Sequence, residues 1–305
     1  TNSFNQEIDY LLLLSLDNRV KLASHENYLE HEQYLEGTGI WENKGGIAIV
    51  ISALQALRFI RSLKKIKVGI LLTTDSTIDG KYAKSIIQQK AELAKHVIAV
   101  SGSSKNGGLV LSRSGSASYR FDSKLVKKDK TENISLMAMN FNKTLANIVD
   151  ISRNDTENLI APYDIQFKSN IFRESAHGSA GISVRFNSAN ELELIEHKLN
   201  KILSPQKRSK IYQVQFEGGQ KRPAMPVNKE TEVLYDKIKL IAKNIDVRVL
   251  EGHRWSSADI CHIQKQMPKI DGLGPIGEFL PSNNERILRH SLVERALLLA
   301  LVLSK

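Results

Sequence analysis

The chain has one cysteine, few aromatic residues (6%) and no long apolar run. A single thiol, Cys261, cannot form an internal disulfide or a thiolate metal cage, so disulfide scaffolds and zinc ribbons are excluded and a reducing compartment is favoured. The most apolar stretch, residues 296–303, is far shorter than the roughly 20 residues that a membrane-spanning helix requires. We therefore expect a cytoplasmic protein with no membrane partner.

The composition that remains is typical of a folded protein. The 305 residues are 41% apolar, and this length favours two domains over one. Lys and Arg (43) exceed Asp and Glu (33), which gives a formal charge of +10. The densest lysine runs, 124–130 and 237–243, are interrupted by acidic or aliphatic residues and carry no interleaved aromatics, so we expect no nucleic-acid partner.

The first part of the sequence alternates strand and helix patterns. Apolar residues recur at helical spacing from Ile47 to Ile60, between the apolar strand segments 9–16 and 66–72. A helix at 80–94 and a strand at 96–100 follow. Strands that are apolar on both faces and separated by helices are typical of a parallel βαβ sheet. The sequence thus predicts an α/β fold with a mostly parallel sheet flanked by helices.

The pattern changes in the middle of the chain. Its predicted elements are a strand at 109–121, a helix at 137–151, a hairpin of 166–174 and 180–186, a helix to about 203 and a strand at 210–216. The order β-α-β-β-α-β predicts an inserted split-βαβ (ferredoxin-like) domain. The expected boundaries are 1–114 for the first part of the α/β domain, 115–218 for the insertion and 219–305 for the second part.

Local signals place several boundaries within these elements. We predict the hairpin turn at His177-Gly178 and a further strand at 247–250. Capping boxes at Ser188–Glu191 and Ser291–Glu294 predict the starts of two helices. The glycines of the turn before residue 47 are expected to be needed for its backbone conformation.

Five sequence segments together resemble the family of co-catalytic zinc exopeptidases and deacylases, which includes aminoacylase, acetylornithine deacetylase and glutamate carboxypeptidases. They are residues 37–46 (GTGIWENKGG), 71–75 (LLTTD), 221–225 (KRPAM), 270–277 (IDGLGPIG) and Glu285. Their order and spacing match the family over nearly the whole chain, although the family's first segment, before the strand at Leu11, is absent. The resemblance implies that the insertion is a lid that pairs with a second copy, so we expect a homodimer.

The resemblance also implies that the two-zinc site is lost. A histidine ligand position carries Leu16, and the bridging aspartate becomes Glu42. The general base and a paired ligand become Ser76 and Thr77. The remaining ligand positions carry Lys95 and Pro281. Zinc requires about four donors and hydrolysis requires a proton acceptor, so we expect neither a cofactor nor catalysis.

Two charged residues carry more specific hypotheses. Lys95 is predicted to lie within about 4 Å of Glu42, as a cation in place of the metal; alternatively it is a solvent-facing lysine at a strand start. Arg222, beside Pro223, corresponds to a family clamp for the substrate's carboxylate, since a guanidinium binds that group with two donors. Alternatively, Arg222 pairs with an acid where the chain leaves the insertion.

These observations leave three functional hypotheses. The first is a non-catalytic protein of the zinc exopeptidase family that binds a small carboxylate-bearing ligand. The second is an active zinc amidohydrolase or carboxypeptidase that acts on N-acyl amino acids or small peptides through residues outside this alignment. The third is a purely structural partner subunit with no small ligand. Metal content separates the first two.

Overall fold

The computed structural model describes residues 7–18, 28–127, 132–153, 158–280 and 284–305. The chain divides into two compact units. Unit 1 comprises residues 1–113, 225–254 and 258–305, and unit 2 comprises residues 114–224 and 255–257. Each unit has its own sheet and its own hydrophobic core, and each is described separately below.

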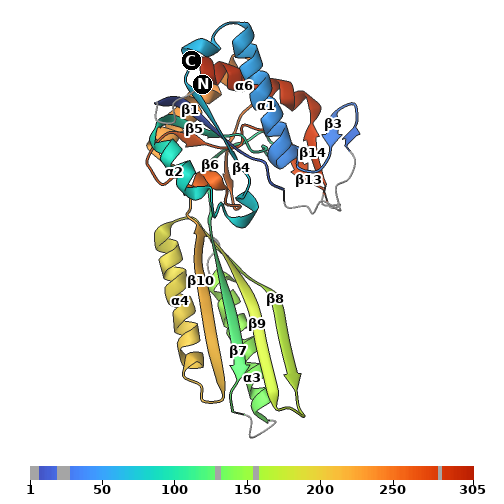
Figure 1. The fold of residues 1–305 in the computed structure, drawn as a ribbon, viewed down its shortest axis with the longest axis vertical. Coiled ribbons are helices and arrows are strands. Elements are labelled where there is room, and N and C mark those ends of the chain that lie inside the picture. Colours follow the sequence, from blue (N-terminus) through green and yellow to red (C-terminus); the bar gives the residue numbers. More distant parts are fainter. Residues whose placement is uncertain (1–6, 19–27, 128–131, 154–157, 281–283) are drawn as a thin grey trace. The chain divides into compact units, whose positions relative to one another are not determined.

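A parallel sheet forms the centre of unit 1 (Figure 1). Its strand order is β12 (Lys269–Ile270), β5 (Ala94–Ala99), β1 (Ile8–Ser15) and β4 (Val68–Thr73), and all three pairings are parallel. The apolar β1 is buried along most of its length between β4 and β5. This sheet and its flanking helices confirm the predicted α/β class.

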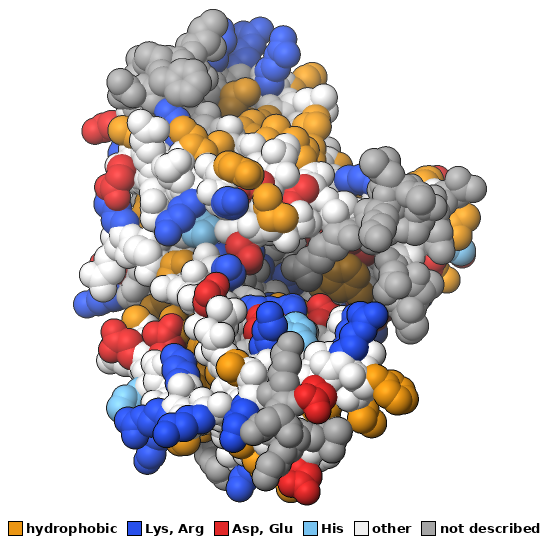
Figure 2. Space-filling view, turned by 60° about the horizontal axis from the view of Figure 1, so that its bottom comes forward, with side chains coloured by type: hydrophobic (Ala, Val, Ile, Leu, Met, Phe, Trp, Pro, Cys, Tyr) orange, Lys and Arg blue, Asp and Glu red, His pale blue; other side chains and the backbone are white. Residues whose placement is uncertain are grey.

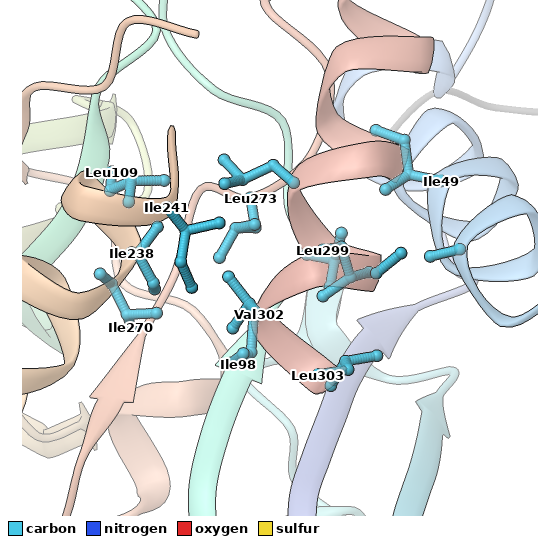
Figure 3. Close-up of a cluster of buried hydrophobic side chains, with 14 of the residues drawn as sticks. Ile49, Ile98, Leu109, Ile238, Ile241, Ile270, Leu273, Leu299, Val302 and Leu303 are labelled. Atoms are coloured by element: carbon cyan, nitrogen blue, oxygen red, sulfur yellow. The ribbon is translucent and has the colours of Figure 1, made fainter. Parts of the chain in front are cut away.

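Helices cover both faces of this sheet. On one face α1 (Gly45–Phe59), α5 (Lys229–Lys243) and α6 (Arg289–Ser304) share a core with the sheet. Figure 3 shows Ile238 and Ile241 of α5 and Val302 of α6 close to Ile98 of β5. On the other face α2 (Lys84–Glu92) packs Ile87 against a separate cluster that contains Cys261. In the part of the chain that the structure describes, no helix is long and apolar enough to cross a membrane.

Two smaller sheets complete unit 1. The strands β6 (Leu109–Arg113) and β11 (Glu251–Arg254) form a parallel pair. The second is an antiparallel sheet in the order β13 (Gly277–Phe279), β14 (Glu285–Leu288), β3 (Tyr34–Glu36) and β2 (Leu29–Glu30). Through β14, this sheet supplies Glu285 to the turn that precedes α1.

Unit 2 has the element order β-α-β-β-α-β. The elements are β7 (Gly115–Leu125), α3 (Glu132–Arg153), β8 (Leu159–Asn170), β9 (Ser175–Phe186), α4 (Ala189–Lys207) and β10 (Tyr212–Arg222). Its antiparallel sheet has the order β10-β7-β9-β8. Phe121 and Phe186 of the sheet are buried with Ile148 of α3 and Leu199 of α4. β10 continues through Gly218 and Gly219, so this unit extends to Ala224, beyond the expected boundary at 218.

Some local predictions were wrong. The β8–β9 turn lies at residues 171–174, not at His177-Gly178, which is inside β9. Its residues, Ile-Phe-Arg-Glu, are not turn formers, but Asn170 before them accepts the Arg173 N–H at 2.9 Å, and Glu174 has a positive φ of 43°. The strand expected at 247–250 begins instead at Glu251, because the apolar Val247 and Val249 pack into the core as an irregular segment before β11.

The two predicted helix caps had different outcomes. Ser188 caps α4 as expected, since the Glu191 N–H donates to its Oγ at 3.2 Å. Ser291 does not cap α6, which begins at Arg289. The buried Ser291 hydroxyl instead donates to Leu288 O at 2.6 Å and accepts from Ile276 N–H at 3.0 Å. It therefore connects the first turn of α6 to the loop before β13.

Candidate functional site

The carboxyl ends of the parallel strands define the candidate site in unit 1. Strands that run in parallel end at one edge of their sheet, and this edge is where α/β proteins bind ligands. Asp17 follows β1, and its carboxylate accepts the Thr77 N–H, beyond β4, at 2.5 Å. The side-chain amide of Asn43 donates to the Asp17 carbonyl oxygen. Residues 15–18, 76–77 and 40–44 therefore meet at one edge.

A single π-helical turn, Ile40–Lys44, carries Glu42 into this edge. The turn follows Gly39, whose positive φ of 71° favours glycine. Glu285 accepts N–H groups from Trp41 at 2.7 Å and from Glu42 at 2.9 Å through one carboxylate oxygen. Burial raises the pKa of Glu285, and the negative charge of Glu42 raises it further. The hydrogen bonds from the two N–H groups lower it, but less than burial raises it. Glu285 is thus a structural carboxylate that orients the turn.

Gly45 and Gly46 are required for close packing. Both lie at the start of α1 with ordinary helical geometry, so backbone conformation does not explain them. A Cβ atom on Gly46 would overlap the Val100 carbonyl oxygen, and one on Gly45 would overlap the Ile40 carbonyl oxygen. The expected reason for these two glycines, turn conformation, is therefore wrong. Gly46 allows α1 to approach the residue after β5, and Gly45 allows it to approach Ile40 and Pro275.

A buried ion pair lies at the next part of the edge. Arg113 donates to Asp271 through Nε at 2.9 Å and Nη2 at 2.6 Å, and both side chains are nearly inaccessible to solvent. Ser101, just beyond β5, donates its hydroxyl to the other Asp271 oxygen at 2.5 Å. Burial disfavours the Asp271 carboxylate, but Arg113 and these hydrogen bonds outweigh burial and lower its pKa.

Arg254 brings a second guanidinium to this edge. It lies 5.2 Å from the centre of the Trp41 ring, and its Nη2 donates to Gly102 O at 2.5 Å. Trp41 is itself fixed, because its Nε1 donates to Ser103 O at 2.7 Å. Burial lowers the pKa of Arg254 to about 10, and the neighbouring Arg113 adds to this, while the charges of Asp271 and Glu42 oppose it. Arg254 therefore stays charged at neutral pH.

Lys95 is not part of this site, and its predicted pairing with Glu42 is wrong. Its ammonium contacts Asp9 at 2.9 Å, and 60% of the side chain is exposed. Lys95 lies at the amino end of β5, whereas the turn with Glu42 lies beside the carboxyl end. The two residues therefore lie at opposite edges of the parallel sheet, which is why the predicted pairing does not form. Ser101 and Gly102 occupy the position after β5 that faces the site.

Comparison with known proteins places this arrangement in a structural family. No protein-family model matches the sequence, and no curated protein matches it. Among solved structures, a tripeptidase from Staphylococcus aureus is similar over 100% of this chain and 82% of its own, with a TM-score of 0.73 and 14% identity. Human carnosine dipeptidase 1 is similar over 100% and 81%, with a TM-score of 0.70 and 13% identity.

A metallo-carboxypeptidase of the M20 family from Sulfolobus solfataricus is also similar, over 99% of this chain and 86% of its own. Its TM-score is 0.71 and its identity 10%. The chain has the M20 peptidase fold. The resemblance inferred from the sequence is confirmed at the level of the fold, which is all that identities this low can show.

The remaining positions assigned to the M20 metal site carry no strong donors. Leu16 lies at the site edge with 48% of its surface exposed, and Ser76 and Thr77 form a short 3₁₀ turn after β4. The sequence assigned no role to Asp17. Its carboxylate accepts hydrogen bonds from the Thr77 N–H and the Ser15 hydroxyl. Burial opposes the Asp17 carboxylate, but these hydrogen bonds lower its pKa. Pro281 is outside the described residues.

The described residues do not fit a zinc pair. Zinc binds through imidazole, thiolate and carboxylate groups, and a catalytic site uses at least three of them. No cluster of three or more His, Cys, Asp or Glu side chains that could hold a metal occurs among residues 7–18, 28–127, 132–153, 158–280 and 284–305. The Arg254 guanidinium lies at this edge, over the Trp41 ring, and a cation there opposes the binding of another.

Arg222 belongs to unit 2, at the end of β10. It is 3% exposed and lies opposite Ser116 of β7. An interior position is unusual for arginine, which is seldom buried without a partner. The burial is compatible with either expectation for Arg222, and the carboxylate clamp remains a proposal.

Sequence reasoning missed two arginines of the candidate site, Arg113 and Arg254. Arg113 ends an alternating strand at a position that should be apolar, and this break in the pattern was the available signal. Asp271 was noticed only as part of the glycine-rich 270–277 motif. Arg254 carried no signal, because its role depends on β11 pairing in parallel with β6, far apart in the sequence.

Proposed function

We propose that this M20-fold chain is a non-hydrolytic binding protein whose ligand carries a carboxylate. The observation that carries the proposal is the charge arrangement at the carboxyl edge of the sheet. Where a dinuclear site would need several anionic donors around a cation, the chain has Ser76, Thr77 and Leu16, with the guanidinium of Arg254 over the Trp41 ring.

The missing proton acceptor supports the same proposal. Peptide hydrolysis needs a group that removes a proton from water, and a serine hydroxyl such as Ser76 cannot do so at neutral pH. Of the carboxylates near the edge, those of Glu285 and Asp271 already have structural partners. Glu285 accepts the N–H groups of the Ile40–Lys44 turn, and Asp271 binds Arg113. We infer that the site can hold a ligand without transforming it.

Separately from the edge in unit 1, we propose that Arg222 of unit 2 recognises a carboxylate. A guanidinium donates two parallel hydrogen bonds to a carboxylate, a geometry that lysine cannot reproduce. Titration calorimetry with an N-acetyl amino acid as the probe tests this proposal. We expect Arg222→Gln to abolish measurable binding and Arg222→Lys to weaken it about tenfold or more. Unchanged binding by both variants would leave Arg222 as a purely structural residue.

Metal analysis separates this proposal from an active zinc amidohydrolase. The chain is treated with a chelator, incubated with excess zinc and desalted, and its zinc is then measured by elemental analysis. We expect much less than one zinc per chain and no hydrolysis of N-acyl amino acids or dipeptides. Two zinc ions per chain with hydrolysis would establish the enzyme instead and refute the proposal.

A further inference from the structure

The connection between α1 and β4 combines exposed apolar residues with a high density of positive charge. We call residues 58–67 the basic turn; they read RFIRSLKKIK. Five of these ten residues are Lys or Arg, and the sequence contains no Asp or Glu between Glu42 and Asp75. All five cationic residues are exposed. The end of α1 lies at the top of Figure 1, and Lys and Arg side chains gather at the top of Figure 2.

The apolar residues of the basic turn divide into two groups. Leu63 and Ile66 are partly buried against the core of unit 1 and anchor the turn. Phe59 and Ile60 point away from it, with 89% and 63% of their surfaces exposed. Folding therefore does not account for an aromatic and an aliphatic side chain placed side by side among cations.

The backbone holds this arrangement in place. Arg61 has a positive φ of 59°, which ends the helix sharply, and Ser62 N–H donates to Leu57 O at 2.9 Å. Among the described residues, no ion pair neutralises the side chains of Arg58, Arg61, Lys64 or Lys65. The positive charge of the turn is thus available to an external partner.

We propose that the basic turn docks on an anionic lipid surface. Cations near such a surface each strengthen binding about fivefold, and exposed aromatic and aliphatic side chains enter the region between headgroups and acyl chains. A nucleic acid would use the cations but offers no favourable environment for Ile60. The expectation of no membrane partner rested on the lack of a spanning segment, a criterion that does not detect a surface site. This inference is independent of the proposed ligand binding.

Vesicle co-sedimentation tests the proposal with defined probes. The full chain is mixed with vesicles of phosphatidylcholine alone or with 30% phosphatidylserine, at low and high salt. We expect binding to the anionic vesicles only, weakened at least tenfold by high salt. Replacement of Arg58, Arg61, Lys64 and Lys65 by Gln should weaken binding at least twentyfold, and Phe59→Ser with Ile60→Ser should weaken it about tenfold at unchanged charge.

A matched control uses the other exposed phenylalanine beside an arginine. Phe172 in unit 2 is fully exposed and precedes Arg173, so Phe172→Ser with Arg173→Gln should bind vesicles like the parent chain. Circular dichroism confirms that each variant is folded. The proposal is overturned if the chain does not bind anionic vesicles, or if the control variant loses as much binding as the variants of the basic turn. It is also overturned if soluble polyglutamate binds as well as the vesicles and the apolar substitutions do not weaken binding.

Discussion

Arg113 and Asp271 form an almost fully buried ion pair, in which Nε and Nη2 of Arg113 donate to one Asp271 oxygen, Oδ2, at 2.9 and 2.6 Å. Removing one partner from such a pair leaves a buried charge without its counterion. We expect Arg113→Met to lower the free energy of unfolding by about 3–5 kcal/mol, and Arg113→Met with Asp271→Leu to cost less. Denaturant unfolding measures both.

The matched control for this experiment is the Arg120–Asp122 pair of unit 2. Its atoms are 3.1 Å apart, but 55% of the Arg120 side chain is exposed. Arg120→Met should therefore change the free energy of unfolding by less than about 1 kcal/mol. Equal losses from Arg113→Met and Arg120→Met would show that burial does not determine the strength of these pairs.

Lys95→Met should leave stability unchanged within measurement error. The Lys95–Asp9 contact is exposed to solvent, and Asp9 keeps a second partner, the Lys67 N–H at 2.9 Å. Solvent screening makes such contacts weak. Thermal unfolding of the variant is the measurement. A large drop in the melting temperature would show instead that Lys95 contributes to the stability of the folded protein.

Glu285→Gln should stabilise the protein at neutral pH. The folded state raises the pKa of Glu285 above that of the unfolded chain, so the folded state binds the proton more tightly. The parent chain must therefore lose stability as pH rises from the unfolded pKa through the folded pKa. The variant lacks this dependence and keeps an oxygen for the Trp41 and Glu42 N–H groups. Its advantage should be absent near pH 4 and complete above the folded pKa, as measured by unfolding across pH.

Arg295 is a buried cation whose charge we expect stability not to require. It is fully buried in α6, where Nη2 donates to Gly107 O at 2.6 Å and, within the described residues, Nε and Nη1 have no partner. Burial lowers its pKa to about 10. Arg295→Met keeps the volume without the charge and should leave the melting temperature unchanged or raise it. Arg295→Ala should cost about 2–3 kcal/mol because it leaves a cavity.

The predicted homodimer gives a fifth test. β8 is an edge strand of the unit 2 sheet, and Leu159 and Ile165 on it are more than half exposed. A stable dimer through this strand should bury roughly 1,200–2,000 Å² in total. We expect a dimer by analytical ultracentrifugation at micromolar concentration and a monomer for Leu159→Lys with Ile165→Lys. A parent chain that sediments as a monomer at tens of micromolar would contradict the prediction.

Periodicity alone was sufficient for the α/β class. The apolar strand 9–16 and the helical spacing from Ile47 reflect burial against immediate neighbours, and the structure has β1 and α1 there. Turns were harder, because Ile171 and Phe172 occupy the β8–β9 turn, and the one turn-favouring signal is Asn170 before them, whose side chain accepts the Arg173 N–H at 2.9 Å.

The candidate site was only partly predictable. Leu16, Glu42, Ser76 and Thr77 lie at strand ends or in the turn before α1, and their assignment to metal-site positions stays a prediction. The predicted pairing of Lys95 with Glu42 was wrong because spacing along the sequence did not distinguish the start of β5 from its end. Arg254 could not be found, since it reaches Gly102 through a strand pairing that links residues about 140 positions apart.

The β8–β9 turn also has a consequence for handling the protein. Phe172 is fully exposed at its tip, next to Arg173, in a segment without strand hydrogen bonds of its own. Proteases cleave preferentially at such exposed tips. Trypsin should therefore cut after Arg173 and chymotrypsin after Phe172 before they attack the sheet. The two fragments would remain associated, because β8 and β9 stay paired along most of their length. A nicked chain would thus migrate as one species until it is denatured.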